Sequence, residues 1–202
     1  FSAGGDFNEV TQLPYLPPKK TEEWIDRVID LYQSCLAINK PVVMAVDQHC
    51  IGIGFQLAMC GDIIMASPEA QFTMPELRGG IACTIGSYML DKVFGRARML
   101  ELTMRTEPLP IDQAKSSGFV YDIVPGSDLM AAAATEAERC QSYPVEPFQT
   151  TKLSRNRDFM RGLDQIRIDS KEAHTSSFQK KSAEQYMRGV LNVSKSKGAD
   201  SL

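Results

Sequence analysis

Two short glycine-bearing loops are the first candidates for chemistry in this 202-residue sequence: residues 2–6 read SAGGD and residues 51–54 read IGIG. Glycine allows close backbone approach and positive φ, which leaves backbone N–H groups free to point at a ligand. Two such groups that converge on one oxygen form an oxyanion hole. Neither loop is a G-x-G-x-x-G motif or a P-loop, so nucleotide phosphate binding is disfavoured. Two tight turns without a catalytic role are the alternative.

Glu76 is the second candidate, because it follows an apolar segment and Pro75 directly and is flanked by apolar side chains. A carboxyl group in apolar surroundings has a raised pKa, which suits proton transfer near neutral pH. A surface ion pair with Arg78 is the alternative. Gln56, two residues beyond Gly54, lies in a segment that we expect to be a buried helix. Its amide can orient a water or a carboxylate but cannot act as a base, and structural hydrogen bonding is its default role.

Other catalytic chemistries find little support. The sequence has no G-x-S-x-G elbow, so a serine hydrolase of that type is disfavoured. Its two histidines, His49 and His174, are too few for a histidine-rich metal centre, and we expect His174 to be a partly exposed helix residue. Five widely spaced cysteines without a C-x-x-C pair favour reduced core thiols over a disulfide framework or a zinc site.

Composition narrows the class of protein further. The net charge of −3 and the pI of about 5.5 give no electrostatic footprint for nucleic acid or for an anionic membrane surface. No segment approaches the roughly 20 uninterrupted apolar residues of a membrane-spanning helix. We therefore expect a soluble cytoplasmic protein that binds neither nucleic acid nor membrane.

The elements that must position these residues follow a βαβ rhythm. Apolar runs at residues 41–46 and 62–66 predict buried strands, with a buried helix over 55–60 between them and a short strand at 71–74. This order is typical of a parallel sheet and an α/β fold. Before it, residues 6–20 resemble a loop, and an apolar stripe predicts a helix from a Thr21 cap to about Asn39.

The second half of the chain becomes helical. We predict a helix over 84–94 that ends at Gly95, shorter helices over 97–104 and 112–117, and a strand at 119–124. From Asp128 onward the pattern indicates helices alone, with a polar tail from Ser194. The chain is accordingly divided into an α/β core at 1–127 and a C-terminal helical region at 128–202 that packs on a partner or neighbouring subunit.

Five ordered motifs resemble those of the crotonase (enoyl-CoA hydratase/isomerase) superfamily. They read FSAGGDF at 1–7, NKPVVMAVD at 39–47, GIGFQLA at 52–58, DI at 62–63 and FTMPE at 72–76. The resemblance implies a spiral of βαβ units followed by a helical region that drives trimerisation, and hence a homotrimer or hexamer. It also implies further strands before Phe1, so we expect the N-terminal strands of the fold to be missing from this chain.

The resemblance assigns roles to individual residues. The backbone N–H groups of Gly5 and Ile53 would form the oxyanion hole for a thioester carbonyl, and Glu76 would be the catalytic carboxyl group. Coenzyme A would enter as part of the substrate, with no permanently bound cofactor and no metal. The residues implied to line the substrate path are Ala3, Gly4, Asp6, Phe7 and Gly54.

Gln56 departs from the hydratase pattern. Enoyl-CoA hydratases carry two catalytic glutamates, and here the second matches Glu76 while the first falls on Gln56. One carboxylate beside an oxyanion hole is more typical of isomerases and of enolate-forming enzymes.

The segment EEWIDRVIDLYQ at 22–33 resembles one group in the superfamily, the carboxymethylproline synthases of carbapenem biosynthesis. For that group the resemblance implies malonyl-CoA decarboxylation, attack of the enolate on pyrroline-5-carboxylate, and thioester hydrolysis. Gln56 would then lie near the substrate carboxylate or the hydrolytic water, and Glu76 would be the base for that water. Trp24 and His174 coincide with positions of the group and are pocket or interface candidates. An enoyl-CoA isomerase or hydratase-like enzyme and a catalytically silent assembly protein are the alternatives.

Overall fold

The computed structural model describes residues 1–180 and 183–190. Its strands form two small parallel sheets, one with the order β1-β3-β5 and one in which β2 pairs with β4. In the first sheet Val43 lies opposite Ile63, and in the second Cys50 lies opposite Phe72. The strands are β1 (Val43–Val46), β2 (His49–Ile51), β3 (Ile63–Ala66), β4 (Gln71–Thr73) and β5 (Asp122–Ile123).

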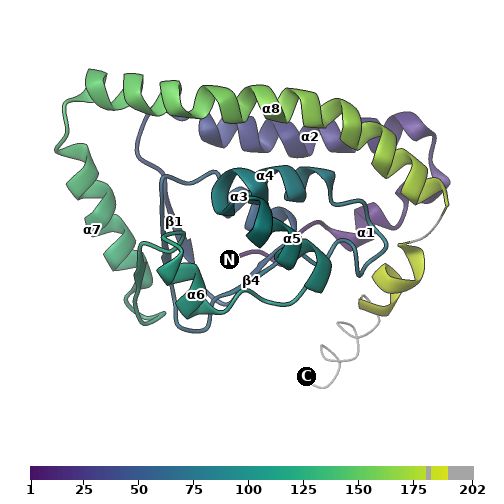
Figure 1. The fold of residues 1–202 in the computed structure, drawn as a ribbon, viewed down its shortest axis with the longest axis horizontal. Helices are drawn as coiled ribbons and strands as arrows, with labels where there is room; N and C mark the ends of the chain where they lie inside the picture. The colour runs from purple at the N-terminus through teal and green to yellow at the C-terminus, as the bar shows by residue number, and fades with distance from the viewer. Residues whose placement is uncertain (181–182, 191–202) are drawn as a thin grey trace.

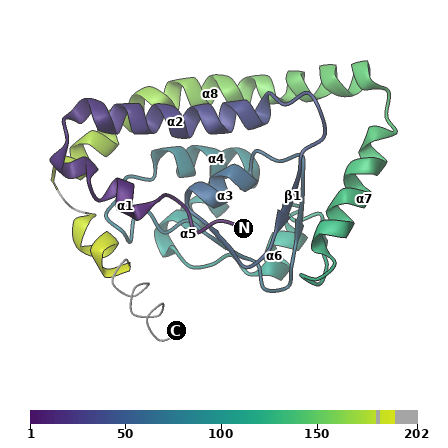
Figure 2. The same ribbon diagram turned by 180° about the vertical axis from the view of Figure 1, so that it is seen from behind.

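The helices surround these sheets. Two long helices, α2 and α8, lie side by side along one edge of the molecule, with α3 and α4 beneath them (Figures 1 and 2). The helices, in chain order, are α1 (Phe7–Val10), the 3-10 turn η1 (Leu13–Tyr15), α2 (Pro18–Leu36), α3 (Ile53–Ala58), α4 (Thr84–Phe94), α5 (Arg96–Arg105), α6 (Ile111–Ser116), α7 (Leu129–Gln141) and α8 (Val145–Gln179). Within the described ranges, no helix combines the length and the apolar character needed to cross a membrane.

Helix α2 begins earlier than its predicted cap. Pro18 is its first residue, and Thr21 is buried inside the helix, so the prediction of Thr21 as the cap was wrong. Proline suits the first helical position because the N–H it lacks has no partner there. On this helix Leu31 is 44% exposed, whereas Tyr32 is fully buried.

Other predictions of local structure can be compared directly. The helix over 84–94 is confirmed with the same bounds, and Gly95 follows it at a φ of 77°. The predicted strand at 119–124 is reduced to β5, and β2 was not predicted at all. The segment 6–20 was expected to be a loop, but it contains α1 and η1.

The larger of two hydrophobic clusters joins the sheets to α8, and a smaller one of Met65, Leu129 and Ala133 packs α7 on the first sheet. At the sheet end of the larger cluster the aromatic rings of Phe55, Phe72, Phe94 and Phe119 pack against one another with centroids 5.0–6.2 Å apart. At its other end the same cluster includes Leu163 and further α8 side chains. Helix α8 therefore packs on α2 and α4 of its own chain. The division of the chain after residue 127 stays a prediction, and the polar tail lies outside the described residues.

Candidate active site

A pocket opens where five segments meet: the loop before α1, the start of α3, the loop after β4, and the facing sides of α2 and α8. It contains the two predicted N–H donors, the predicted carboxyl group and the predicted aromatic positions. All but two of the sequence-predicted site residues line it, namely Ala3, Gly4, Gly5, Phe7, Trp24, Ile53, Gln56, Glu76 and His174. The structure thus brings together residues that lie up to 171 positions apart in the chain.

Asp6 and Gly54 do not line the pocket, but each contacts a segment next to it. The Asp6 carboxylate is exposed and caps α1, because Oδ1 accepts a hydrogen bond from the N–H of Asn8 over 2.8 Å. Gly54 lies against the N-terminal segment: a Cβ atom there would stand 2.6 Å from Ser2 Cβ. That close approach lets the first residues of the chain run beside β2, where Ser2 and Cys50 form a parallel bridge.

The two glycine loops meet through these contacts. Ile51 N–H donates to Ser2 O over 3.0 Å, and a Cβ atom on Gly4 would lie 4.0 Å from Ile53 N. Gly52 has a φ of 54° and donates its own N–H to Thr73 O, so the chain turns sharply before α3. Among the described residues, neither Gly5 N–H nor Ile53 N–H has a hydrogen-bond acceptor. Two neighbouring backbone donors are therefore available to a ligand oxygen in this pocket.

Glu76 enters the pocket from the loop after β4. Burial raises the pKa of its carboxyl group to about 7. Oε1 accepts a hydrogen bond from Gln56 Nε2 over 3.2 Å, and Oε2 lies 4.0 Å from the Cys83 thiol. The alternative of a surface pair with Arg78 was wrong, because the Arg78 guanidinium donates to the Thr106 carbonyl instead. Glu76 is consequently a partly buried residue whose carboxyl group can gain or lose a proton near neutral pH.

Gln56 has a complete set of partners around its amide. Its Oε1 accepts from the Tyr32 hydroxyl over 2.7 Å, and its Nε2 donates to Glu76 and lies 3.5 Å from Met74 Sδ. Sequence reasoning missed Tyr32 and Cys83 as neighbours of the carboxyl group. Helix phase could have indicated Tyr32, since it lies four residues after Val28 and eight after Trp24, on the same side of α2.

An aromatic wall closes the pocket between α2 and α8. The Trp24 ring lies 6.2 Å from both the His174 and the Phe178 rings, and those two rings are 5.9 Å apart. His174 is 5% exposed, so the prediction of a partly exposed residue was wrong. The cause is the packing of α8 over α2, which the sequence pattern of α8 alone did not reveal.

The proton of the His174 imidazole can be placed. Burial lowers the pKa of His174, so the ring is neutral near pH 7. Its Nδ1 lies 2.9 Å from Ser170 O, and a carbonyl oxygen can only accept, so Nδ1 carries the proton. Nε2 is then left as an acceptor at the pocket wall.

Thiol and metal chemistry have little support in the described part of the chain. Cys83 lines the pocket, but burial raises the pKa of its thiol, which disfavours the reactive thiolate. All five cysteines are free and buried, as expected for core thiols. Among residues 1–180 and 183–190, no three His, Cys, Asp or Glu side chains gather in a way that could hold a metal ion.

Comparison with known families gives the class of this chain. The model of the family described as enoyl-CoA hydratase/isomerase matches residues 1–197. The chain therefore belongs to this family, the crotonase superfamily of acyl-CoA enzymes.

Among sequence relatives, the carboxymethylproline synthase of Pectobacterium carotovorum subsp. carotovorum is 42% identical over 191 residues, which are 95% of this chain and 76% of that protein. A probable mitochondrial enoyl-CoA hydratase of Dictyostelium discoideum is 29% identical over 178 residues, or 87% of this chain and 62% of the relative. The chain thus spans only part of the length of both relatives.

Solved structures agree with this class. ThnE from S. clavuligerus aligns with a TM-score of 0.70 and 36% identity, over 72% of this chain and 74% of that one. Human mitochondrial delta3-delta2-enoyl-CoA isomerase aligns with a TM-score of 0.84 over 98% of this chain and 76% of its own, at 20% identity. The second likeness concerns the fold alone. Together they confirm the predicted α/β crotonase-like fold.

Proposed function

We propose that this chain is a carboxymethylproline synthase-like enzyme that forms and directs a thioester enolate. The substrate class is a malonyl thioester of coenzyme A, with pyrroline-5-carboxylate as the second substrate. Coenzyme A is part of the substrate, so the reaction needs no permanently bound cofactor. The contact between Glu76 and Gln56 in the pocket, in a chain 42% identical to a carboxymethylproline synthase, carries the proposal.

The first step uses the two unpartnered backbone donors. The thioester carbonyl of malonyl-CoA accepts hydrogen bonds from Gly5 N–H and Ile53 N–H. The bond between the α-carbon and the carboxylate breaks and CO₂ leaves. The electron pair of that bond stays on the α-carbon and forms the enolate, whose negative oxygen these donors stabilise. Removal of one such donor costs roughly 3–4 kcal/mol of barrier in other enzymes.

The later steps consume the enolate and release coenzyme A. The enolate carbon attacks the imine carbon of pyrroline-5-carboxylate, and the ring nitrogen takes up a proton. Water then adds to the new thioester while the Glu76 carboxylate accepts its proton, and the C–S bond breaks to release the thiol of coenzyme A. A carboxyl group with a pKa of about 7 can accept this proton near neutral pH and return it to the leaving thiolate.

The pocket also contains groups that suit the second substrate. Trp24 offers an apolar face to the pyrroline ring, and neutral His174 offers the Nε2 lone pair to a protonated imine or ring nitrogen. Gln56 holds the Glu76 carboxyl group in place. Asp6 and Gly54 have supporting roles in this scheme, because they do not line the pocket.

The test is product formation from malonyl-CoA and pyrroline-5-carboxylate, detected by mass. We expect the mass of carboxymethylproline, and we expect Glu76→Ala to abolish it while malonyl-CoA still binds. If acetyl-CoA forms without a coupled product, the proposed enolate step is supported but pyrroline-5-carboxylate is not the second substrate. If a folded protein leaves malonyl-CoA unchanged, the proposal fails.

An enoyl-CoA isomerase is the second candidate. The observation in its favour is the single carboxyl group: Glu76 is the only Asp or Glu among the described residues that line the pocket. One carboxyl group with a pKa near 7 suffices to move a proton between two carbons of an enoyl thioester. Isomerisation of a 3-enoyl-CoA to the 2-enoyl isomer, followed by absorbance, separates this activity from the release of CO₂ from malonyl-CoA.

Assembly and location follow the same proposal. We expect a cytoplasmic homotrimer or hexamer in which the helical region of residues 128–202 contributes to subunit contacts. Light scattering on the purified protein distinguishes these assemblies from a monomer.

A further inference from the structure

Tyr32 contacts the candidate active site without lining its pocket. It lies on α2, its side chain is fully buried, and its hydroxyl donates to Gln56 Oε1 over 2.7 Å. Gln56 in turn donates from Nε2 to Glu76 Oε1 over 3.2 Å. Three side chains from α2, α3 and the loop after β4 therefore form a linear series that ends on the candidate base.

When Glu76 is ionised, the donors and acceptors of this series fit only one orientation of the Gln56 amide. Glu76 Oε1 and Met74 Sδ are both acceptors, and both face Nε2. The Tyr32 hydroxyl is the donor on the other side, and it keeps its proton because burial raises its pKa well above the ordinary value. A reversed amide would place Gln56 Oε1 against the Glu76 carboxylate, so that two acceptors would face each other.

We propose that Tyr32 is a positioning residue that holds the Gln56 amide in the orientation that donates to the ionised Glu76 carboxylate. This inference rests on the role of Glu76 as base in the proposed function. A hydrogen bond from Nε2–H stabilises the charged form of Glu76 and opposes the effect of burial. Through Gln56, Tyr32 keeps more of the base ionised at neutral pH.

Loss of the hydroxyl would have a defined consequence. In Tyr32→Phe the Gln56 carbonyl has lost its donor, so a buried acceptor is left unsatisfied. The amide then satisfies this oxygen by rotating it toward Glu76, where it accepts from the protonated carboxyl group. The protonated form thereby gains a hydrogen bond, whereas the ionised form keeps its Nε2–H donor only with the Gln56 carbonyl left unsatisfied. We expect the pKa of Glu76 to rise by about one unit.

The experiment measures this pKa without relying on turnover. The infrared C=O band of protonated Glu76, assigned by its loss in Glu76→Gln, is titrated in the purified protein and in each variant. Tyr88→Phe is the matched control: its hydroxyl donates to Phe159 O of α8 over 3.0 Å, and Tyr88 does not line the pocket that contains Glu76. Tyr32→Phe should raise the midpoint, and Tyr88→Phe should leave it unchanged.

A second background tests whether the effect passes through Gln56. Gln56→Met removes the amide at similar volume, so this variant alone should raise the midpoint. Adding Tyr32→Phe to Gln56→Met should move it no further, because no amide remains to be oriented. An unchanged midpoint in Tyr32→Phe, or an equal shift in both backgrounds, would overturn the inference. Failure of malonyl-CoA turnover with these shifts present would refute the proposed reaction and leave the positioning role standing.

Discussion

The Gln56 side chain donates to Glu76 Oε1 over 3.2 Å, and this contact joins the first turn of α3 to the loop after β4. Because a neutral amide occupies this place, Glu76 shares no proton with a second carboxyl group among the described residues of the pocket. A lone buried carboxyl group has a pKa set mainly by burial and by its few hydrogen bonds. The protonation state of Glu76 is therefore a measurable property of the site, independent of any substrate.

Replacing Glu76 with Gln is expected to stabilise the protein at pH 8 but not at pH 4. Burial raises the pKa of Glu76 from 4.5 to about 7 in the folded protein. Between these values the folded state binds a proton that the unfolded chain has released, so stability falls as pH rises through this window. Above it the ionised carboxylate costs up to about 3 kcal/mol, a cost that Gln avoids.

Urea unfolding at the two pH values measures this difference. Glu69→Gln is the control, because Glu69 is exposed and its replacement should change stability by no more than about 0.5 kcal/mol at either pH. Equal effects of Glu76→Gln at pH 4 and pH 8 would contradict a raised pKa for Glu76.

Replacing Gly52 with Ala is expected to reduce turnover by about a hundredfold. A Cβ atom on Gly52 would stand 3.0 Å from Glu76 Oε1, and the φ of 54° disfavours any side chain. The carboxyl group and the neighbouring Ile53 N–H would both have to move. The readout is the rate of coenzyme A release from malonyl-CoA.

Gly118→Ala supplies the matched control for backbone strain. Gly118 has a φ of 79°, but a Cβ atom there would meet nothing within 4 Å. Both variants should lose about 1–2 kcal/mol of stability from the left-handed backbone conformation. Only the Gly52 variant should lose activity, and an equal loss in both would assign the effect to general destabilisation.

The sequence predicted the local features of the fold better than the contacts between distant elements. Helix α4 was predicted with its bounds because a C-terminal glycine marks its end. The start of α2 was missed because Pro17 and Pro18 resembled a loop, although proline is favoured at the first helical position. Short strands such as β2 carry too few residues for a period to show.

The candidate site shows the same contrast. The motifs identified Glu76, Gln56 and the two glycine loops, because these residues belong to short sequence patterns. The contact of Tyr32 with Gln56 and the burial of His174 depend on how α2 packs against α3 and α8. That packing is a tertiary property, which no segment expresses by itself.

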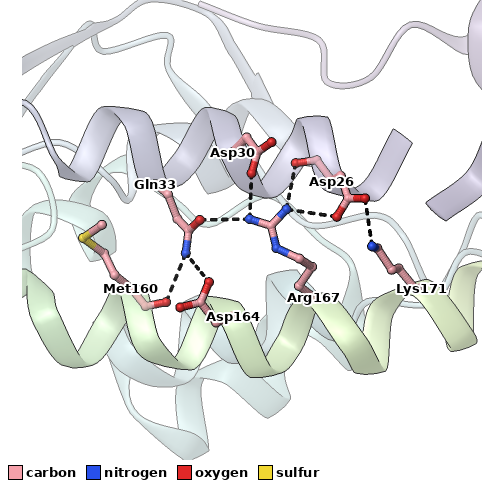
Figure 3. Close-up of polar contacts among 7 residues, drawn as sticks. All are labelled: Asp26, Asp30, Gln33, Met160, Asp164, Arg167 and Lys171. Carbon is pink, nitrogen blue, oxygen red and sulfur yellow. Dashed lines mark hydrogen bonds and ion pairs between the residues drawn. The ribbon is translucent and has the colours of Figure 1, made fainter. Parts of the chain in front are cut away.

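Arg167 joins α8 to α2, and its replacement by Met is expected to cost about 1–3 kcal/mol. Its guanidinium donates to Asp26 Oδ1 over 3.0 Å, to Asp30 Oδ1 over 2.7 Å and to Gln33 Oε1 over 2.9 Å (Figure 3). These partners lie on one face of α2, and the Arg167 side chain is only 19% exposed. The planar guanidinium contacts three α2 side chains and the Asp26 carbonyl at once, so Arg167→Lys should not restore the loss.

Thermal unfolding of the two Arg167 variants measures this effect. Lys20→Met is the control, because Lys20 pairs with Glu23 at the surface and both side chains are well exposed. Such a pair contributes about 0.5 kcal/mol or less. Because α2 carries Trp24 and α8 carries His174, Arg167→Met should also weaken binding of the second substrate. If Arg167→Met is as stable as Lys20→Met, the contacts of Arg167 with α2 do not hold the two helices together.

Replacing Lys152 with Met is expected to destabilise the fold by about 3–5 kcal/mol. Lys152 is 1% exposed, and its ammonium group donates to Asp62 Oδ2 over 2.7 Å and to Lys40 O over 2.8 Å. Asp62 is itself buried and also accepts from Val42 N–H beside β1. Without Lys152 the buried Asp62 carboxylate loses its buried counter-charge, which is the reason for the large cost.

Arg155→Met tests whether burial is the deciding factor. Arg155 pairs with the same carboxylate through Oδ1, but its side chain is 52% exposed. Water can take the place of the Arg155 guanidinium beside Asp62, so Arg155→Met should lower stability by no more than about 1 kcal/mol. Urea unfolding near pH 7 compares the two variants, and Asp62→Asn in the Lys152→Met background should recover part of the loss by removing the unpaired charge. Equal losses of stability in Lys152→Met and Arg155→Met would show that burial of the partner does not decide how strongly it stabilises the Asp62 carboxylate.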